Sequence, residues 1–235
     1  MKVKDAIVLV TGANRGFGLQ LVHELIARGA KKVYAGMRTP VDLGIEGVVP
    51  VKLDVTNADD VAAAAALCSD TTLLVNNAGI AQFGGYLDAN SIDIARDMFE
   101  TNYYGVIRMS QAFAPVLKAN GGGGIVNVLS VASWISSPLL GPYAATKSAV
   151  WSFTNTLRQH LSEQGTQVLG LHVGFMDTDM THGIEFPKTD PRVVAAKTLD
   201  ALEAGKAEVF GDELTEKVKL GLSAEQAVYL APVVR

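Results

Sequence analysis

The chain of 235 residues contains a single cysteine, Cys68. One cysteine excludes an internal disulfide and any cysteine-rich metal site. It is compatible with a reducing compartment. The four histidines, His23, His160, His172 and His182, show none of the spacings typical of metal ligands, so we expect no metal site.

The sequence also lacks an apolar run of the roughly 20 residues that a membrane helix needs. The first apolar run, residues 6–10, is broken by Thr11-Gly12 and is too short for a signal peptide. Charged residues make up 19% of the chain, the net charge is −4, and the basic residues are scattered. We therefore expect a soluble, cytoplasmic protein with neither a membrane-binding nor a nucleic-acid-binding surface.

Short apolar runs alternate with longer segments of helical period, and 49% of the residues are apolar. Strands are predicted at residues 6–10, 33–35, 48–53, 72–76, 125–129, 168–173 and 208–210. Helices are predicted around residues 19–26, 54–66, 91–120, 143–163 and 190–204. Continuously apolar strands that alternate with helices are typical of a parallel sheet covered on both faces. We predict a single doubly wound, Rossmann-like α/β domain over residues 1–235.

Residues 178–191 are the exception to this regularity. The segment is polar, contains Pro187 and Pro191, and has no clear period. Irregular segments of this kind in α/β domains are often mobile loops over a site, so we predict a substrate loop here. His182 and Phe186 lie in it and are candidates for substrate contact.

A glycine-rich loop separates the first predicted strand from the first predicted helix. It reads Thr11-Gly12-Ala13-Asn14-Arg15-Gly16-Phe17-Gly18. Glycines allow a tight turn and let backbone N–H groups approach a pyrophosphate, which the positive end of the helix dipole also favours. A glycine-rich turn without a ligand is the alternative. The position between a strand and a helix, at the start of an α/β chain, favours a dinucleotide.

The end of the second predicted strand indicates which dinucleotide binds. An NAD site has a carboxylate about 20 residues after the glycine loop, where it binds the ribose 2′-hydroxyl. Here the segment reads Tyr34-Ala35-Gly36-Met37-Arg38 and contains no acid. Arg38 and Arg15 are able to hold a 2′-phosphate through charge-assisted bonds of about 1.5–3 kcal/mol each. Unless both are ordinary surface charges, this pattern predicts NADP(H) rather than NAD(H).

Tyr143 and Lys147 form a Y-x-x-x-K pair on a predicted helix, which places the phenol and the ammonium on one face. The pair alone is common by chance, but Ser130 and the segment Asn76-Asn77-Ala78-Gly79 end two predicted strands, where ligands bind in open parallel sheets. A lysine charge about 5 Å from the phenol stabilises its ionised form by about 3.3 kcal/mol at an effective dielectric of about 20. An oxidised nicotinamide would add a second positive charge, burial opposes both, and we expect a tyrosine pKa moved from 10 toward 7.

In combination, these segments resemble the classical short-chain dehydrogenase/reductase family. The matching pieces occur in family order across about three quarters of the chain. They are residues 11–18, Leu53-Asp54-Val55, residues 76–79, Asn102, Ser130, residues 143–147 and residues 174–178.

The resemblance implies a role for each matching residue. Tyr143 would be the general acid in reduction and the general base in oxidation, and Lys147 would lower its pKa and hold the nicotinamide ribose. Ser130 would bind the substrate oxygen, and Asn102, unless it merely begins a helix, would position a water in a proton relay. The implied cofactor-binding residues are Gly12, Asn14, Arg15, Gly16, Phe17, Gly18, Arg38, Asp54, Val55, Asn77, Ala78, Gly79, Tyr143, Lys147, Gly174, Met176 and Thr178.

The resemblance further implies an NADP(H)-dependent enzyme that reduces a ketone or aldehyde, or oxidises a secondary alcohol, and that assembles as a dimer or tetramer through helices around residues 102–118 and 143–162. Two alternatives stay open: a non-catalytic NADP(H)-binding redox sensor, and a mainly oxidative sterol or sugar alcohol dehydrogenase. Apolar residues at 83–86 and 138–142 favour an apolar or aromatic ketone. One departure is Val173, where the family usually has proline.

Overall fold

Seven parallel strands form one sheet in the computed structural model, which describes residues 1–230. Their order across the sheet is β3-β2-β1-β4-β5-β6-β7. Their bounds are β1 Ile7–Thr11, β2 Lys32–Met37, β3 Val48–Lys52, β4 Leu73–Asn76, β5 Gly124–Val128, β6 Gln167–His172 and β7 Glu208–Phe210. All seven predicted strands are present, and the prediction of a doubly wound parallel sheet is confirmed.

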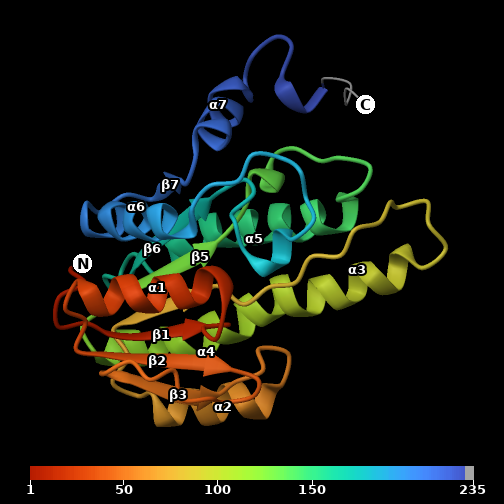
Figure 1. Ribbon diagram of the computed structural model, residues 1–235. Helices are drawn as coiled ribbons and strands as arrows, with labels where there is room; N and C mark the ends of the chain where they lie inside the picture. The colour runs from red at the N-terminus through yellow and green to blue at the C-terminus, as the bar shows by residue number, and fades with distance from the viewer. Residues whose placement is uncertain (231–235) are drawn as a thin grey trace.

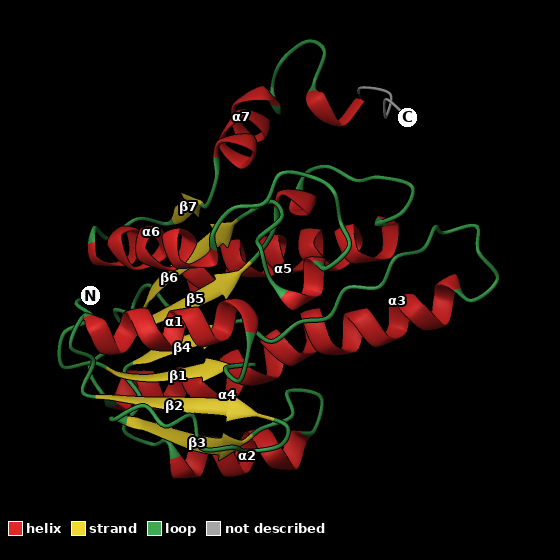
Figure 2. Cartoon of the chain, in the orientation of Figure 1, coloured by secondary structure: helices red, strands yellow, loops and turns green. Residues whose placement is uncertain are grey.

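Helices cover both faces of this sheet (Figures 1 and 2). They are α1 Gly16–Ala27, α2 Ala58–Leu67, α3 Ser91–Phe99, α4 Gly105–Ala119, α5 Gly141–His160, α6 Pro191–Glu203 and α7 Glu213–Gly221. Successive strand side chains point to opposite faces, so Val8 and Val10 pack with α1 and α6, whereas Leu9 packs with α2, α4 and α5. This alternation explains why the strands read as continuously apolar. No helix within residues 1–230 is long and apolar enough to cross a membrane.

Polar side chains define the beginnings of several helices. Asn57 accepts hydrogen bonds from the amides of Asp59 and Asp60 at the start of α2. Asp190 caps α6 in the same way, and the prolines at the starts of α5 and α6 occupy positions where no amide hydrogen is needed. These local signals explain why the helix boundaries follow the sequence pattern closely.

Two elements differ from the prediction. The expected helix over residues 91–120 is divided into α3 and α4 by a π-helical turn, Glu100–Tyr104. Such turns are rare, have no sequence period of their own and occur often at functional sites. Helix α7 was not predicted, and it stands beyond β7, away from the sheet (Figure 1).

Candidate active site

The parallel register brings the predicted site segments to one edge of the sheet. Thr11 of β1 lies opposite Gly36 of β2, and Asn76 of β4 lies opposite Asn127 of β5. The chain therefore leaves β1, β2, β4, β5 and β6 at the same edge, into the segments that carry the candidate residues. This is the carboxyl edge, where open parallel sheets bind ligands.

Gly12 and Gly18 show why the loop needs glycines. Gly12 has a φ of +65°, which disfavours any side chain. A β-carbon on Gly18 would collide with the Gly12 carbonyl oxygen and lie 2.6 Å from Nδ2 of Asn77. The loop is consequently a tight turn whose backbone a ligand can approach closely.

The N-terminus of α1 is free to bind an anion. Arg15 is its N-cap residue, yet within the described part of the chain no side chain caps the helix and its first turn holds no acidic residue. The first N–H groups of a helix need partners, and an anion supplies them favourably. The loop thus fits the pyrophosphate of a dinucleotide.

Thr11 connects the glycine loop to the end of β4, a role that the sequence pattern did not reveal. Its hydroxyl oxygen accepts hydrogen bonds from the amides of Asn77 and Ala78, at 3.0 and 2.9 Å. Nδ2 of Asn77 donates to the carbonyl oxygens of Thr11 and Gly12, at 2.8 and 3.2 Å. Asn77, predicted to contact the cofactor, therefore holds the shape of the loop.

The two arginines predicted to select the cofactor both reach solvent. Arg38 follows β2 directly and is exposed. Arg15 is also exposed, and its guanidinium lies 3.5 Å from the carboxylate of Asp179, across from the glycine loop. An exposed ion pair of this kind is worth little, so Arg15 is easily released for another anion.

Asp54 and Val55 form a turn after β3. The Asp54 carboxylate accepts hydrogen bonds from the amide and the hydroxyl of Thr56, at 2.9 and 2.7 Å. Val55 is buried, and a β-carbon on Gly105 would lie 2.7 Å from its side chain. Their contact with adenine stays a prediction.

Helix α5 carries Tyr143 and Lys147 one turn apart. Nζ of Lys147 lies 5.6 Å from the centre of the Tyr143 ring and donates a hydrogen bond of 2.9 Å to the carbonyl oxygen of Val128, at the end of β5. Ser130 begins a short 3-10 helix, Val131–Ser133; its hydroxyl accepts from the amide of Ala132 and donates to the carbonyl oxygen of Val173. The sequence placed Ser130 at the end of the strand, and it lies just beyond.

Asn102 lies in the π-helical turn and is buried, so the idea that it merely begins a helix is wrong. Its side chain accepts from the amide of Ile80 at 2.8 Å and donates to the carbonyl oxygen of Ile80 at 2.9 Å and to the hydroxyl of Thr146 at 3.1 Å. It thereby connects the end of β4 to α5. Its role in a water relay stays a prediction.

Burial dominates the ionisation of the tyrosine and the lysine. It raises the pKa of Tyr143 to about 12, against a hydrogen bond with Ser130 that lowers the pKa. It also lowers the pKa of Lys147 from 10.5 to about 8. Without cofactor, loss of solvation thus outweighs the hydrogen bond with Ser130. The expected fall of the Tyr143 pKa toward 7 also includes the positive charge of an oxidised nicotinamide, so it stays a prediction for the complex.

Residues 6–188 match the family model described as short chain dehydrogenase. The chain belongs to the short-chain dehydrogenase family. It is accordingly an oxidoreductase with a fold that binds a nucleotide cofactor.

The dehydrogenase is similar to several known proteins over nearly all of its length. The solved structure of a short chain dehydrogenase from Burkholderia cenocepacia, in complex with NADP, is 37% identical, with 99% of this chain and 100% of that chain covered and a TM-score of 0.93. The 3-oxoacyl-[acyl-carrier-protein] reductase FabG of Vibrio cholerae is 29% identical, with 89% and 91% covered. Dehydrogenase/reductase SDR family member 7B of Danio rerio is 28% identical, with 97% and 81% covered.

The buried lysine of the dehydrogenase is expected to lower the stability of the fold. Because the pKa of Lys147 is about 8 when folded and near 10.5 when unfolded, the proton favours the unfolded chain by about 3 kcal/mol below pH 8. Lys147→Met should raise the free energy of unfolding at pH 7 by about 2 kcal/mol, since it also removes a hydrogen bond worth about 1 kcal/mol. The gain should shrink between pH 8 and pH 10.5, as the folded wild type loses the proton.

Urea denaturation at pH 7 and pH 10 measures this difference. Lys118→Met, on the exposed end of α4, is the matched control and should change little at either pH. A Lys147→Met variant that is less stable than the wild type at pH 7 would contradict the prediction.

Helix α7 also supports the cofactor side of the dehydrogenase. Asp212 accepts a 2.6 Å hydrogen bond from the amide of Gly174, and its other oxygen caps α7 through the amide of Thr215. The role of Asp212 was not predicted, because its contact with Gly174 joins segments that are far apart in the sequence and meet only in the folded sheet. The chain is thereby held to α7 shortly before the irregular segment begins at Thr178.

The irregular segment is a loop with both ends hydrogen-bonded together. The amide of Asp177 donates to the carbonyl oxygen of Thr189 at 3.0 Å. The amide of Thr189 donates to the carbonyl oxygen of Phe175 at 2.8 Å. These bonds hold Met176 beside Thr189, while Thr178 adjoins Gly16 of the glycine loop. Gly174, Met176 and Thr178 therefore lie along the same edge as the glycine loop. Their contact with the cofactor and the mobility of the segment stay predictions.

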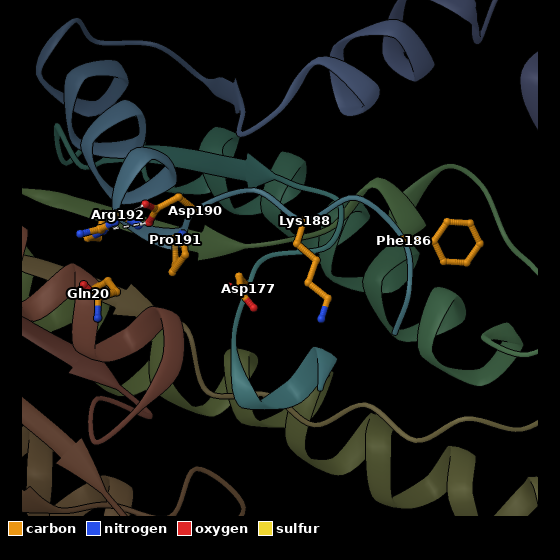
Figure 3. Close-up of a pocket in the computed structure, with 7 residues that line it drawn as sticks. All are labelled: Gln20, Asp177, Phe186, Lys188, Asp190, Pro191 and Arg192. Carbon is orange, nitrogen blue, oxygen red and sulfur yellow. Dashed lines mark hydrogen bonds and ion pairs between the residues drawn. The ribbon is translucent and has the colours of Figure 1, made fainter. Parts of the chain in front are cut away.

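A cavity of about 720 Å³ lies between α1 and this loop (Figure 3). Its lining is Gln20, Asp177, Phe186, Lys188, Asp190, Pro191 and Arg192. Phe186 stacks on Phe175, with ring centres 5.7 Å apart, so it is held by the loop itself. Tyr143 is not among the residues that line the cavity.

The two apolar segments predicted to shape the substrate site lie together beside Tyr143. The hydroxyl of Tyr86 donates to the carbonyl oxygen of Gly141 at 3.0 Å. The amide of Gly84 donates to the carbonyl oxygen of Leu139 at 2.9 Å. Phe83 and Leu139 are each more than half exposed. Apolar side chains therefore face solvent next to the start of α5.

Proposed function

We propose that this dehydrogenase reduces a ketone or aldehyde with NADPH, or oxidises the corresponding secondary alcohol with NADP⁺. The observation that supports the proposal is the convergence of Tyr143, Lys147 and Ser130 at the sheet edge that also carries the uncapped start of α1. A bound nicotinamide would supply or accept the hydride at the substrate carbon.

The side chains of the chain itself handle the proton. In reduction, the Tyr143 hydroxyl gives its proton to the substrate oxygen, and in oxidation the phenolate takes the proton back. The raised pKa of Tyr143 suits the first direction, because the phenol is protonated at neutral pH before cofactor binds. The Ser130 hydroxyl, which donates to the Val173 carbonyl oxygen in this structure, turns its proton to the same substrate oxygen when substrate binds. Lys147, fixed by the Val128 carbonyl, stabilises the phenolate that forms.

The preference for NADP(H) is supported by Arg38 and Arg15 and by the absence of an acid at the end of β2. The similar Burkholderia cenocepacia protein is a complex with NADP, which agrees with this choice. Exposed apolar side chains at Phe83 and Leu139 support an apolar carbonyl substrate.

A panel of ketones, aldehydes and secondary alcohols, assayed through the absorbance of NADPH, tests the function. We expect consumption of NADPH with an apolar or aromatic ketone, with one alcohol formed for each NADPH oxidised. Tight binding of NADPH without turnover of any compound would contradict the proposal and support the redox sensor instead. Turnover of sterol or sugar alcohols alone would support the oxidative alternative.

A further inference from the structure

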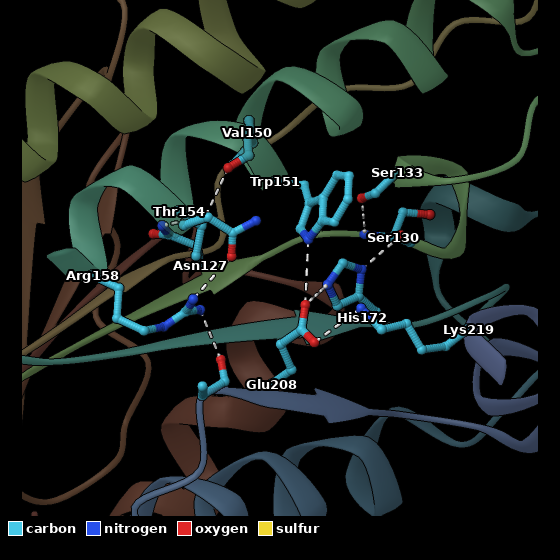
Figure 4. A network of polar contacts seen from close by, with 12 residues as sticks. Asn127, Ser130, Ser133, Val150, Trp151, Thr154, Arg158, His172, Glu208 and Lys219 are labelled. Carbon is cyan, nitrogen blue, oxygen red and sulfur yellow. Dashed lines mark hydrogen bonds and ion pairs between the residues drawn. The ribbon is translucent and has the colours of Figure 1, made fainter. Parts of the chain in front are cut away.

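A buried histidine lies directly behind the turn that carries Ser130 (Figure 4). His172 is the last residue of β6 and is fully buried. Its Nδ1 lies 3.2 Å from the carbonyl oxygen of Ser130. The indole of Trp134, at the end of the same turn, stacks on the imidazole with ring centres 3.9 Å apart. From the sequence alone His172 has no assigned function.

The residue after the histidine holds the same serine. The carbonyl oxygen of Val173 accepts from the Ser130 hydroxyl at 3.3 Å and from the amide of Val131 at 2.9 Å. Two consecutive residues of the chain thus contact Ser130, one at the hydroxyl and one at the backbone carbonyl.

The other ring nitrogen of His172 faces Glu208, at the start of β7. Oε1 of Glu208 lies 3.4 Å from Nε2, yet Nε2 is buried without a hydrogen bond. The Glu208 carboxylate is instead engaged by Nε1 of Trp151 at 3.3 Å and by Nζ of Lys219 at 3.1 Å. The lysine of α7 also lies over the rings of Trp134 and Trp151.

These neighbours decide which nitrogen carries the proton. A carbonyl oxygen and a carboxylate are both acceptors, and a neutral imidazole has one N–H. Burial, the largest cause, lowers the pKa of His172 against the opposing effects of Glu208 and Ser130, so the ring is neutral at neutral pH. The contact of Nδ1 with the Ser130 carbonyl oxygen has hydrogen-bond geometry and that of Nε2 with Glu208 does not, so the geometry favours the N–H on Nδ1.

We propose that His172 is a positioning residue for Ser130: its Nδ1–H donates to the Ser130 carbonyl oxygen and thereby holds the turn from which the serine hydroxyl reaches the substrate oxygen. The proposal rests on the function proposed above for Ser130. The lysine–glutamate pair of α7 and β7 holds the far side of the histidine, so α7 supports the site without entering it.

Two amide substitutions separate this role from simple packing. In His172→Asn the amide nitrogen takes the place of Nδ1 and keeps a donor near Ser130, whereas in His172→Gln it takes the place of Nε2 and faces Glu208. Both variants lose the stacked ring, so their packing losses are matched. We expect His172→Asn to keep kcat for the ketone within about threefold of wild type, and His172→Gln to lose about tenfold or more, the equivalent of one hydrogen bond. The dissociation constant for NADPH should be unchanged in both.

A second measurement does not depend on activity. The chain has four histidines, and two-bond nitrogen–proton correlation spectra of ¹⁵N-labelled wild-type protein report the tautomer of each. We expect His172 to carry its proton on Nδ1, with the signal assigned by its loss in His172→Asn. A proton on Nε2 overturns the proposal, as do equal losses of kcat in the Asn and Gln variants. If the wild type reduces no carbonyl compound, the proposed function fails. The tautomer of His172 then tests on its own whether Nδ1–H donates to the Ser130 carbonyl oxygen.

Discussion

Replacing Tyr143 with phenylalanine is expected to lower kcat for ketone reduction by about 10³-fold while NADPH binding stays as in the wild type. The variant removes one hydroxyl and keeps the ring beside Lys147. Positioned proton donors contribute about 10²–10⁴ to such rates, and the substrate oxygen would then have to take its proton from water. The Ser130 donor and the bound cofactor remain, so a low residual rate should persist.

Steady-state rates together with NADPH titration, followed by the fluorescence of the two tryptophans, measure this split between turnover and binding. Tyr104→Phe is the matched control, because Tyr104 is exposed on the π-helical turn and its hydroxyl has no role in the proposed chemistry. Its kcat should equal that of the wild type. Full activity of Tyr143→Phe would show that another group delivers the proton. Loss of NADPH affinity in that variant would show that the hydroxyl serves binding instead.

Removing this hydroxyl should not weaken the fold. Burial raises the pKa of Tyr143 because its surroundings disfavour charge, and the phenol is neutral throughout the physiological range. Phenylalanine keeps the apolar contacts and costs at most one hydrogen bond, with Ser130. The loss of rate therefore reports on chemistry, since an unfolded fraction would lower NADPH binding in parallel.

The position of Tyr143, Lys147 and Ser130 at one sheet edge follows from local signals. Apolar runs locate the strands, helical period locates α5, and all strands of a parallel sheet end together where ligands bind. Asn102 was named through family resemblance, but its surroundings were not predictable, because a π-helical turn has no period of its own. The sequence therefore predicted where these residues lie more reliably than it predicted how each is held.

Other contributions depend on contacts between distant segments. His172 acts through Ser130, Trp134 and Glu208, and Asp212 acts on Gly174, so neither stands in a recognisable motif. The size of the burial effect on the pKa of Tyr143 was not predictable either, because burial is a property of the folded protein and cannot be read from spacing. Motifs and hydrophobic period predict the strands, the helices and the segments that form the site, whereas the contacts and pKa values of the site residues depend on tertiary packing.

Arg38→Ala should raise the KM for NADPH about 10- to 100-fold and leave the KM for NADH nearly unchanged. A charge-assisted bond to phosphate is worth about 1.5–3 kcal/mol. NADH has no 2′-phosphate, so its binding does not include this bond and should not change when Arg38 is removed. Arg38 is exposed at the end of β2, so its removal should not alter stability. Higher ionic strength should weaken NADPH binding by the wild type more than by the variant.

Arg15→Ala is expected to act in the same direction, and its partner provides the control. The guanidinium lies 3.5 Å from Asp179 on the substrate loop, so the substitution also removes that ion pair. Asp179→Asn breaks the pair and keeps the arginine. If Arg15 binds the 2′-phosphate, Asp179→Asn should bind NADPH at least as tightly as the wild type, because the arginine loses a competing anion. If Arg15 merely closes the loop, both variants should weaken NADPH and NADH alike. Wild-type protein that binds NADH as tightly as NADPH would overturn the assigned preference, whichever arginine is changed.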